Sequence, residues 1–221
     1  MHSRILPAVL ICLACFGAAA HPVLAISPGQ VDDFQDGTTQ NWFVGGPHPF
    51  PPENMPGGPG GDSDRFLLLT AIGNDGPGSR LAVANGLQWA GDYSGAGVAR
   101  IGMYLRNFSD VDLYIRLLLA NPMGGPSTDA AITDASMVPA GSDWTYAEFS
   151  VAAEDLIVLL GDVDVLLGNV TELRIFHNPN PLYPPDPVLA RLGVDQIQAA
   201  GGANPIEESS WGRVKELWRT R

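Results

Sequence analysis

Two short stretches decide the fold. They are Val31-Asp32-Asp33-Phe34-Gln35-Asp36-Gly37-Thr38-Thr39-Gln40-Asn41-Trp42, near the start of the chain, and Leu192-Gly193-Val194-Asp195-Gln196-Ile197, near its end. In both, carboxylates stand beside apolar residues, which is typical of a short strand that is buried on one face. Where the first and last strands of a β-sandwich pair, such carboxylates meet at one place. We therefore expect the two ends of the chain to be neighbours in one sheet.

The acidic residues of these stretches form a candidate calcium site. Asp33, Asp36 and Asp195 offer carboxylates, and Thr38 offers a carbonyl or hydroxyl oxygen. Calcium takes about six to eight oxygen ligands, so backbone carbonyls and water would complete the shell. The first stretch also fits an ordinary Asp-Gly turn, in which an aspartate bonds to nearby backbone. The spacing leaves both interpretations open.

The first 25 residues have the pattern of a signal peptide. An arginine precedes an apolar run at residues 5–16, and small residues follow. Cleavage after Ala25 is favoured, with Ala20 as the alternative. Both cysteines lie within this segment, so the exported domain must be held by its core or by bound metal. No later apolar run approaches the ~20 residues of a membrane helix. We expect a secreted or extracytoplasmic protein without a transmembrane span in its mature chain.

Length and charge narrow the class of protein further. The chain has 221 residues and a formal net charge of −12. What remains after the signal peptide is long enough for one well-buried core and short for two. A chain this acidic repels nucleic acid and anionic lipid surfaces. We expect one domain that does not bind nucleic acid.

Short β-rich segments separated by glycine- and proline-rich turns run through residues 26–200. Several alternate with a period of two, as where Leu113, Ile115, Leu117 and Leu119 share one face. The helical crossovers that a parallel sheet needs are absent from the pattern. The sequence predicts an all-β, antiparallel jelly-roll β-sandwich. Its expected strands are residues 66–71, 80–85, 98–108, 111–120, 130–138, 144–151, 172–177 and 188–198.

Four other segments carry expectations of their own. Residues 47–61 are rich in proline and glycine and predict a long surface loop. Residues 152–160 predict a short helix that begins at an acidic pair. Residues 201–206 predict a linker. Residues 207–221 predict a short C-terminal amphipathic helix with a basic face, which would contact a sorting or surface partner or dock on the sandwich.

Aromatic and charged side chains alternate on the polar sides of several expected strands. Sugars pack their C–H faces on aromatic rings, and their hydroxyls bond to planar charged groups. A sheet face that carries both is a candidate glycan-binding surface. The alternative is a solvated face, or aromatic residues that fill the core. The candidate ligand-binding residues are Tyr104, Arg116, Trp144, Tyr146 and Arg174.

Several segments resemble the galactose-binding-like β-sandwich superfamily, which includes many secreted carbohydrate-binding modules. They are DDFQDGTTQNW, RFLLLTA, GSRLAVAN, QWAGDYSGAGVARIGMYLRNF and LGVDQIQ, and they cover about residues 28–200. The closest likeness is to exported bacterial proteins. The resemblance implies a structural Ca²⁺ shared by the two ends of the domain, here at Asp33, Asp36, Thr38 and Asp195. This chain departs from many relatives by carrying Gln35 in place of an acid.

The sequence offers little for catalysis. It contains no Gly-x-Ser-x-Gly elbow, no His-Glu-x-x-His motif and no cysteine beyond residue 15. We expect a non-catalytic, carbohydrate-binding-like module with a structural calcium, whose partner is a carbohydrate or cell-surface glycan. One alternative is a structural or adhesive surface protein that binds other proteins. A small secreted hydrolase is a further alternative.

Overall fold

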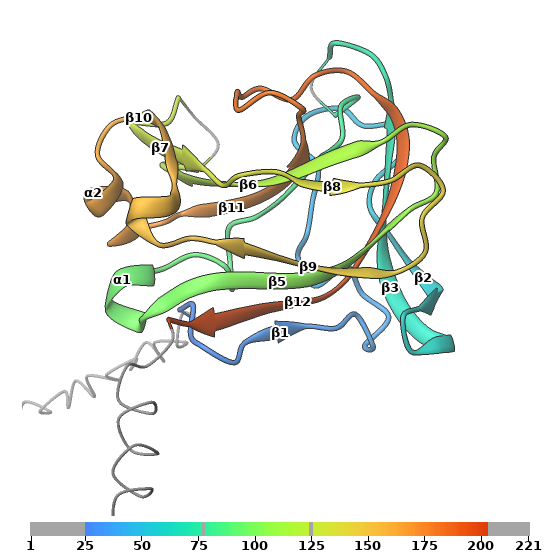
Figure 1. Cartoon of the computed structure of the whole chain (residues 1–221), viewed down its shortest axis with the longest axis horizontal. Helices are drawn as coiled ribbons and strands as arrows, with labels where there is room; N and C mark the ends of the chain where they lie inside the picture. The colour runs from blue at the N-terminus through green and yellow to red at the C-terminus, as the bar shows by residue number, and fades with distance from the viewer. Residues whose placement is uncertain (1–24, 77, 124–125, 203–221) are drawn as a thin grey trace, which may run out of the picture.

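The computed structural model describes residues 25–76, 78–123 and 126–202, which form two antiparallel sheets packed face to face (Figure 1). Sheet A has the order β2-β3-β12-β5-β9, with β1 paired to β12. Its strands are β1 (Val31–Asp32), β2 (Glu53–Gly58), β3 (Gly61–Ile72), β5 (Val98–Asn107), β9 (Thr145–Ser150) and β12 (Leu189–Gly201).

Sheet B has the order β10-β7-β6-β11-β4, with β8 paired to β6. Its strands are β4 (Ala82–Asn85), β6 (Leu113–Asn121), β7 (Asp129–Ile132), β8 (Ser136–Val138), β10 (Ile157–Leu160) and β11 (Glu172–His177). Helical structure in the described residues is limited to α1 (Tyr93–Ala96), α2 (Val163–Leu167) and the 3-10 turn η1 (Ala153–Asp155). The chain passes repeatedly from one sheet to the other, which confirms the predicted jelly-roll sandwich.

The core lies between the sheets and follows the predicted alternation. Leu113, Ile115, Leu117 and Leu119 of β6 are fully buried and face the other sheet. Ile101, Met103 and Leu105 of β5 oppose them from sheet A, and Trp42 and Trp89 close the edge of the core. Burial of this apolar area supplies the main driving force for folding.

The two ends of the domain pair, as predicted. Val31 lies opposite Gln198 and Asp32 opposite Ile197 in the antiparallel β1–β12 ladder. Beside this ladder, the β12–β5 register shifts between Asp195 and Gln198, and Gln196 adopts a left-handed φ of 48°. In a regular strand Asp195 and Ile197, two residues apart, would point to the same face of the sheet. The irregularity between them lets Ile197 pack in the core while Asp195 lies on the other side of sheet A, and both are buried. The ladder therefore brings the acidic residues of both stretches to one part of sheet A.

Two local predictions were wrong. Residues 47–61 are not a continuous loop, because β2 occupies their second half and forms a hairpin with β3. Pro56 has no backbone N–H to donate. An edge strand such as β2 tolerates this because it pairs with a neighbouring strand on one side only. Residues 152–160 are not a helix either: they form η1 and then β10, which pairs with β7. The β-branched pair Ile157 and Val158 favours this strand over a helix.

The expectations for the chain ends lie outside the described residues. Residues 1–24 of the expected signal peptide and residues 207–221 of the expected C-terminal helix belong to this part. Strand β12 continues through Gly201, so it extends into the first residue of the expected linker. Within the described residues, no helix is long and apolar enough to cross a membrane.

Candidate functional site

A cluster of carboxylates lies on the outer side of sheet A, next to the paired chain ends. Asp195 is fully buried, and its Oδ2 atom has no hydrogen-bond partner. The β2–β3 hairpin covers it: a Cβ atom added to Gly58 would lie 3.3 Å from Asp195 Oδ2 and 2.6 Å from Asp64 Oδ2. Burial is the main cause that raises the pKa of Asp195 to about 7, and the nearby carboxylates of Asp64 and Asp33 contribute to the rise. This is a buried acid without a compensating charge.

Oxygen atoms surround the side chain of Gln35 beside this cluster. Gln35 Nε2 lies 2.9 Å from the carbonyl oxygen of Asp33, 2.7 Å from Asp64 Oδ1 and 3.3 Å from the carbonyl oxygen of Arg65. Two backbone carbonyls and a carboxylate thus accept hydrogen bonds from the Gln35 amide, which occupies the point where they converge. Hard oxygen atoms of this kind are the ligands that calcium takes.

The structure separates the predicted metal ligands into two groups. Asp33 lies close enough to Asp195 for its charge to affect the pKa of Asp195, and so does Asp64, which belongs to the β2–β3 hairpin. Asp36 instead accepts hydrogen bonds within its own turn, from Thr38 N at 2.8 Å and Thr38 Oγ1 at 2.9 Å. These bonds lower the pKa of Asp36. The turn interpretation thus describes Asp36 and Thr38, and the metal interpretation fits Asp33 and Asp195.

Sequence reasoning missed Asp64. The only signal was the pair Asp62 and Asp64, which lie between the expected loop, residues 47–61, and the expected strand, residues 66–71, and which belong to β3 in the structure. In the described residues, no three His, Cys, Asp or Glu side chains already stand in the arrangement of a metal site. Asp195 Oδ2 is the oxygen of this cluster that has no hydrogen-bond partner, and it is the observation that a cation site would explain.

A second buried carboxylate lies on the inner side of the same ladder. Asp32 is 4% exposed, and its Oδ2 accepts hydrogen bonds from Trp42 Nε1 and Trp89 Nε1, each at 2.7 Å, and from Gln88 Nε2 at 3.1 Å. Burial raises the pKa of Asp32, while these three bonds act in the opposite direction. Three donors converge on the Oδ2 atom of this carboxylate, which ties β1 to the core.

The predicted ligand-binding residues fall on two opposite faces of the sandwich. Tyr104 belongs to β5 and Tyr146 to β9, both in sheet A, and Trp144 directly precedes β9. Arg116 and Arg174 belong to β6 and β11, in sheet B. The core-facing neighbours of these residues point inward, so the residues themselves lie on the outer faces. The five do not form one surface.

The polar groups of Arg116 and Trp144 are occupied by the protein. Arg116 is buried and donates to the carbonyl oxygens of Asn178, Thr133 and Pro179, so it anchors the loop after β11. Trp144 packs edge-on against Phe66 at 5.1 Å between ring centroids. Its Nε1 donates to the carbonyl oxygen of Gly57 at 3.2 Å, which ties the hairpin to sheet A.

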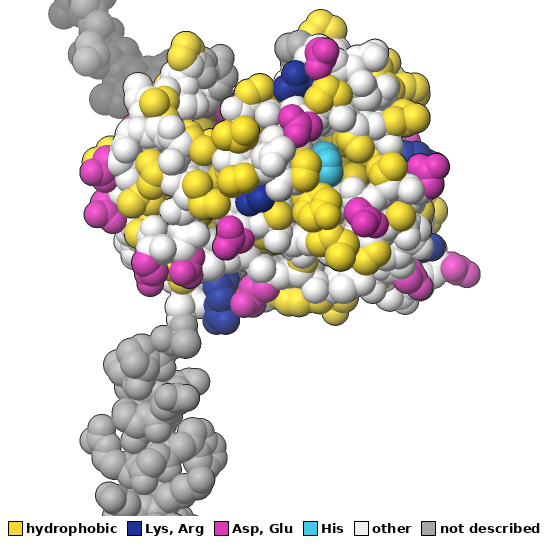
Figure 2. Space-filling view, turned by 45° about the horizontal axis from the view of Figure 1, so that its top comes forward, with side chains coloured by type: hydrophobic (Ala, Val, Ile, Leu, Met, Phe, Trp, Pro, Cys, Tyr) yellow, Lys and Arg dark blue, Asp and Glu magenta, His cyan; other side chains and the backbone are white. Residues whose placement is uncertain are grey.

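The outer face of sheet B is apolar and hollowed. Its floor includes the buried residues Leu118, Ala120, Ala130, Ile132 and Phe176. Figure 2 turns this side towards the viewer and shows hydrophobic side chains spread over it, with a hollow between two raised regions. A cavity of about 500 Å³ lies at the β4 end. Its lining includes Phe43, Arg80, Met123, Glu172, Arg174 and Tyr183. We call this cavity the sheet B groove.

Polar groups in the groove are planar and paired. Arg174 Nε donates to Glu172 Oε1 at 2.5 Å, and Nη2 donates to Oε2 at 2.9 Å, in a bidentate ion pair. Arg174 also donates to the Tyr183 hydroxyl and lies over its ring, 5.2 Å from the centroid. On the facing wall, Arg80 donates to the carbonyl oxygen of Pro185 at 2.6 Å. Of the predicted ligand-binding residues, only Arg174 lines the groove.

Comparisons with known proteins bear on the fold. No protein-family model matches the chain, and no curated protein matches it. Among solved structures, the family 11 carbohydrate-binding module from Clostridium thermocellum, in complex with a β-1,3-1,4-mixed-linked tetrasaccharide, matches with a TM-score of 0.53 and 13% identity. That match covers 81% of this chain and 98% of the module.

Two further structures agree with it. The solution structure of CtCBM11 matches with a TM-score of 0.54 and 16% identity, over 85% of this chain and all of that one. An exo-β-agarase matches with a TM-score of 0.53 and 12% identity, over 80% of this chain and 25% of the enzyme. The chain therefore has the β-sandwich fold of carbohydrate-binding modules.

Proposed function

We propose that this protein is a non-catalytic carbohydrate-binding module that holds a neutral sugar chain in the sheet B groove. The observation that carries the proposal is the 500 Å³ cavity, in which aromatic and apolar side chains lie beside a fixed ion pair. The fold supports it, since a module with this fold is known in complex with a tetrasaccharide. Neither the cavity nor the fold requires a pair of catalytic residues for this function.

The lining of the groove suits both sides of a sugar ring. Phe43 and Met123 are exposed, and Tyr183 is half-buried, so they offer apolar surface to C–H faces. The Glu172–Arg174 pair has no net charge and places the planar Arg174 guanidinium, which is 24% exposed, beside the cavity, while the Glu172 carboxylate is buried behind it. Because the pair is already formed, binding costs little side-chain ordering.

We further propose that Ca²⁺ stabilises the module at the chain ends. Asp33, Asp64 and Asp195 would hold it, together with the carbonyl oxygens of Asp33 and Arg65. The bound ion would supply the positive charge that the buried Asp195 lacks. Asp36 and Thr38 would act by shaping the turn that carries Asp33. The ion would then clamp β1, β12 and the β2–β3 hairpin together.

Export is also part of the proposal. Its support is the pattern of residues 1–25, with cleavage after Ala25. The basic C-terminal segment, residues 207–221, would contact a sorting or surface partner. A glycan-binding module has its ligands outside the cell, so both features agree with the proposed function.

Affinity electrophoresis through neutral polysaccharides tests the groove. Soluble mixed-linked β-glucan, xylan and agarose should be compared, and at least one should retard the full chain. Tyr183→Ala and Phe43→Ala should weaken retardation about 10-fold or more, because each removes ring surface from the cavity. Met137→Ala removes a similarly exposed apolar side chain from β8 and should change nothing.

The alternative of a structural or adhesive protein predicts a different outcome. In that case no polysaccharide retards the wild-type chain, and Tyr183→Ala and Met137→Ala are indistinguishable. Circular dichroism of each variant shows whether it is folded before its binding is compared.

A further inference from the structure

A second surface with sugar-binding chemistry lies on sheet A, on the opposite side of the sandwich from the groove. Strands β5 and β9 pair with Tyr104 opposite Tyr146 and Gly102 opposite Glu148. Arg100, two residues before Gly102, lies opposite Ser150. These side chains alternate with the buried Ile101, Met103 and Leu105, so they occupy the outer face. We call Tyr104, Tyr146, Arg100 and Glu148 the β5–β9 platform.

A glycine holds the Tyr146 ring in place on this platform. A Cβ atom on Gly102 would lie 1.9 Å from the Tyr146 hydroxyl oxygen and 2.6 Å from Cζ, so only glycine allows the ring to lie across β5. Tyr104 packs edge-on against Tyr146 with 5.3 Å between ring centroids. Tyr146 nevertheless remains 50% exposed. An aromatic ring that is supported from two sides and still exposed is pre-organised for stacking.

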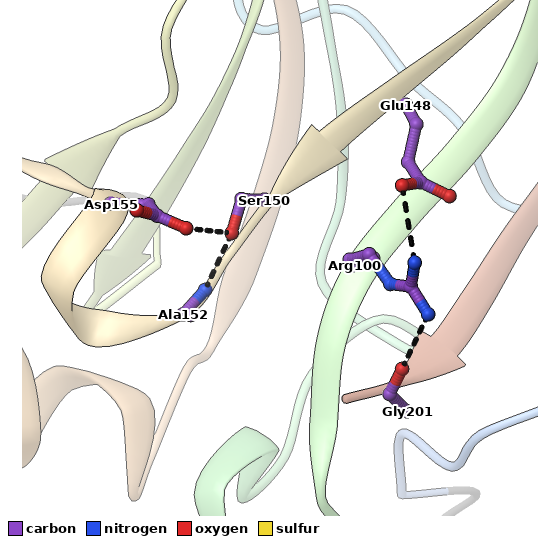
Figure 3. A network of polar contacts seen from close by, with 6 residues as sticks. All are labelled: Arg100, Glu148, Ser150, Ala152, Asp155 and Gly201. Atoms are coloured by element: carbon purple, nitrogen blue, oxygen red, sulfur yellow. Dashed lines mark hydrogen bonds and ion pairs between the residues drawn. The ribbon is translucent and has the colours of Figure 1, made fainter. Parts of the chain in front are cut away.

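Planar polar groups belong to the same strands, and Figure 3 shows Arg100 and Glu148 pointing toward one another. Arg100 Nη1 lies 3.4 Å from Glu148 Oε1, and Arg100 Nη2 donates to the carbonyl oxygen of Gly201 at 3.2 Å. Further along the same edge, Ser150 Oγ donates to Asp155 Oδ2 at 2.7 Å. The side chains of Arg100 and Glu148 are 41% and 44% exposed. They therefore offer free donor and acceptor positions to a ligand.

The charge of the platform selects a neutral ligand. Arg100 and Glu148 cancel each other, and the whole chain carries −12. A polyanion would be repelled by the protein and would find no unpaired cation on this strip. A ligand with an apolar face and many hydroxyl groups fits both the ring and the ion pair, and a pyranose unit is such a ligand.

We propose that the β5–β9 platform is a second glycan-binding site, in which a pyranose unit of a neutral polysaccharide stacks on Tyr146 and bonds to Glu148 and Arg100. This inference rests on the proposed function and extends it. The two sites lie on opposite outer faces, with two sheets ~10 Å apart between them, so one sugar unit cannot contact both. The module is therefore bivalent and bridges two polysaccharide chains.

Titration of the full, isotope-labelled chain with mixed-linked β-glucan tetrasaccharide separates the two sites. Amide shifts should form two groups, one around Tyr146 and Glu148 and the other around Tyr183 and Arg174. Tyr146→Ala should abolish the first group and leave the affinity at the second within about two-fold, because distant sites are additive. Gly102→Ala displaces the ring without removing it, so it should weaken the first group as well.

Bridging is measured with long mixed-linked β-glucan. Wild-type protein should raise the viscosity of the polymer solution, and Tyr146→Ala should reduce that effect about 10-fold or more, because only one site remains. Tyr146→Phe keeps the ring and should retain the effect. Shifts confined to the groove, together with unchanged bridging by Tyr146→Ala, overturn the platform and leave the proposed function standing.

Other results would contradict the groove, both sites, or the assignment of the platform to sugar. Shifts confined to the platform support the second site and contradict the groove. Shifts at neither face with tetrasaccharide, xylo-oligosaccharide or agaro-oligosaccharide contradict both. Self-association of the glycan-free protein that Tyr146→Ala removes, measured by sedimentation velocity, shows that the platform is a contact between copies and overturns its assignment to sugar.

Discussion

The two sides of the β1–β12 ladder each bury one carboxylate, and they treat it in opposite ways. On the inner side, Asp32 receives three N–H donors from Trp42, Trp89 and Gln88. On the outer side, Asp195 has one oxygen without any partner and other carboxylates nearby. Both are almost completely inaccessible to solvent. A buried acid with donors stabilises the fold by itself, whereas the one without a partner is the position at which we propose that a cation binds.

The largest effect is expected on the inner side. Asp32→Ala leaves the two buried indole N–H groups of Trp42 and Trp89 without an acceptor, while Gln88 Nε2 keeps the carbonyl oxygen of Gln40, so the free energy of unfolding should fall by ~3–5 kcal/mol. Urea unfolding with and without calcium measures this, and the loss should be the same in both. Trp89→Phe removes one donor and replaces the buried indole by a smaller ring, but leaves Asp32 two donors, so it should cost less, ~1–3 kcal/mol. A calcium-dependent loss in Asp32→Ala would contradict the separation of the two sides.

Asp195 should respond with the opposite sign. Asp195→Asn removes a buried, unpaired negative charge, so in the presence of chelator the variant should be more stable than wild type by ~1–3 kcal/mol. The same variant should lose the rise in melting temperature that calcium produces in wild type. Thermal unfolding in calcium and in chelator measures both. Equal melting temperatures of wild type in the two solutions would remove the proposed ion.

The metal ligands can be separated by a matched pair of substitutions. Asp64→Asn removes a carboxylate that touches the Asp195 cluster, so calcium affinity should fall about 10-fold or more, equivalent to ~1.4 kcal/mol. Asp36→Asn removes a carboxylate that bonds within its own turn and should leave the affinity nearly unchanged. Isothermal titration with calcium measures both. A larger loss in Asp36→Asn than in Asp64→Asn would restore the ligand set expected from spacing.

The sequence predicted the fold more fully than the sites, for physical reasons. Strand alternation and turn residues are local signals, and they placed β3, β5, β6 and β11 correctly. The pairing of the chain ends followed from the acidic pattern, which placed Asp33 and Asp195 together. Asp64 reaches them through a hairpin whose strand contains proline, and that contact depends on tertiary structure.

The same limit applies to the ligand-binding residues. Alternation shows which side chains share one face of one strand, but it does not show to which sheet a strand belongs. Arg116 and Arg174 were therefore grouped with Tyr104 and Tyr146, although the sandwich places them on opposite faces. Tyr183 lies in a proline-rich loop without periodicity, so no local signal marked it as part of a cavity. Strand order was the missing information.

The smallest expected effect is a dependence of stability on pH. Burial, together with Asp64 and Asp33, raises the pKa of Asp195 to about 7 in the folded protein, above the ordinary value of 3.8 in the unfolded chain. The folded protein therefore holds the proton more tightly, and stability falls as the pH rises towards and through 7. Between about pH 6 and about pH 8, metal-free wild type should lose ~1.4 kcal/mol.

Asp195→Asn should show a flatter profile, because it lacks the titrating group, and saturating calcium should flatten or reverse the wild-type profile. Chemical unfolding at each pH in chelator measures the slope. The same slope in wild type and Asp195→Asn would assign the pH dependence to Asp32, whose pKa burial also raises, and would leave the two sides of the ladder alike.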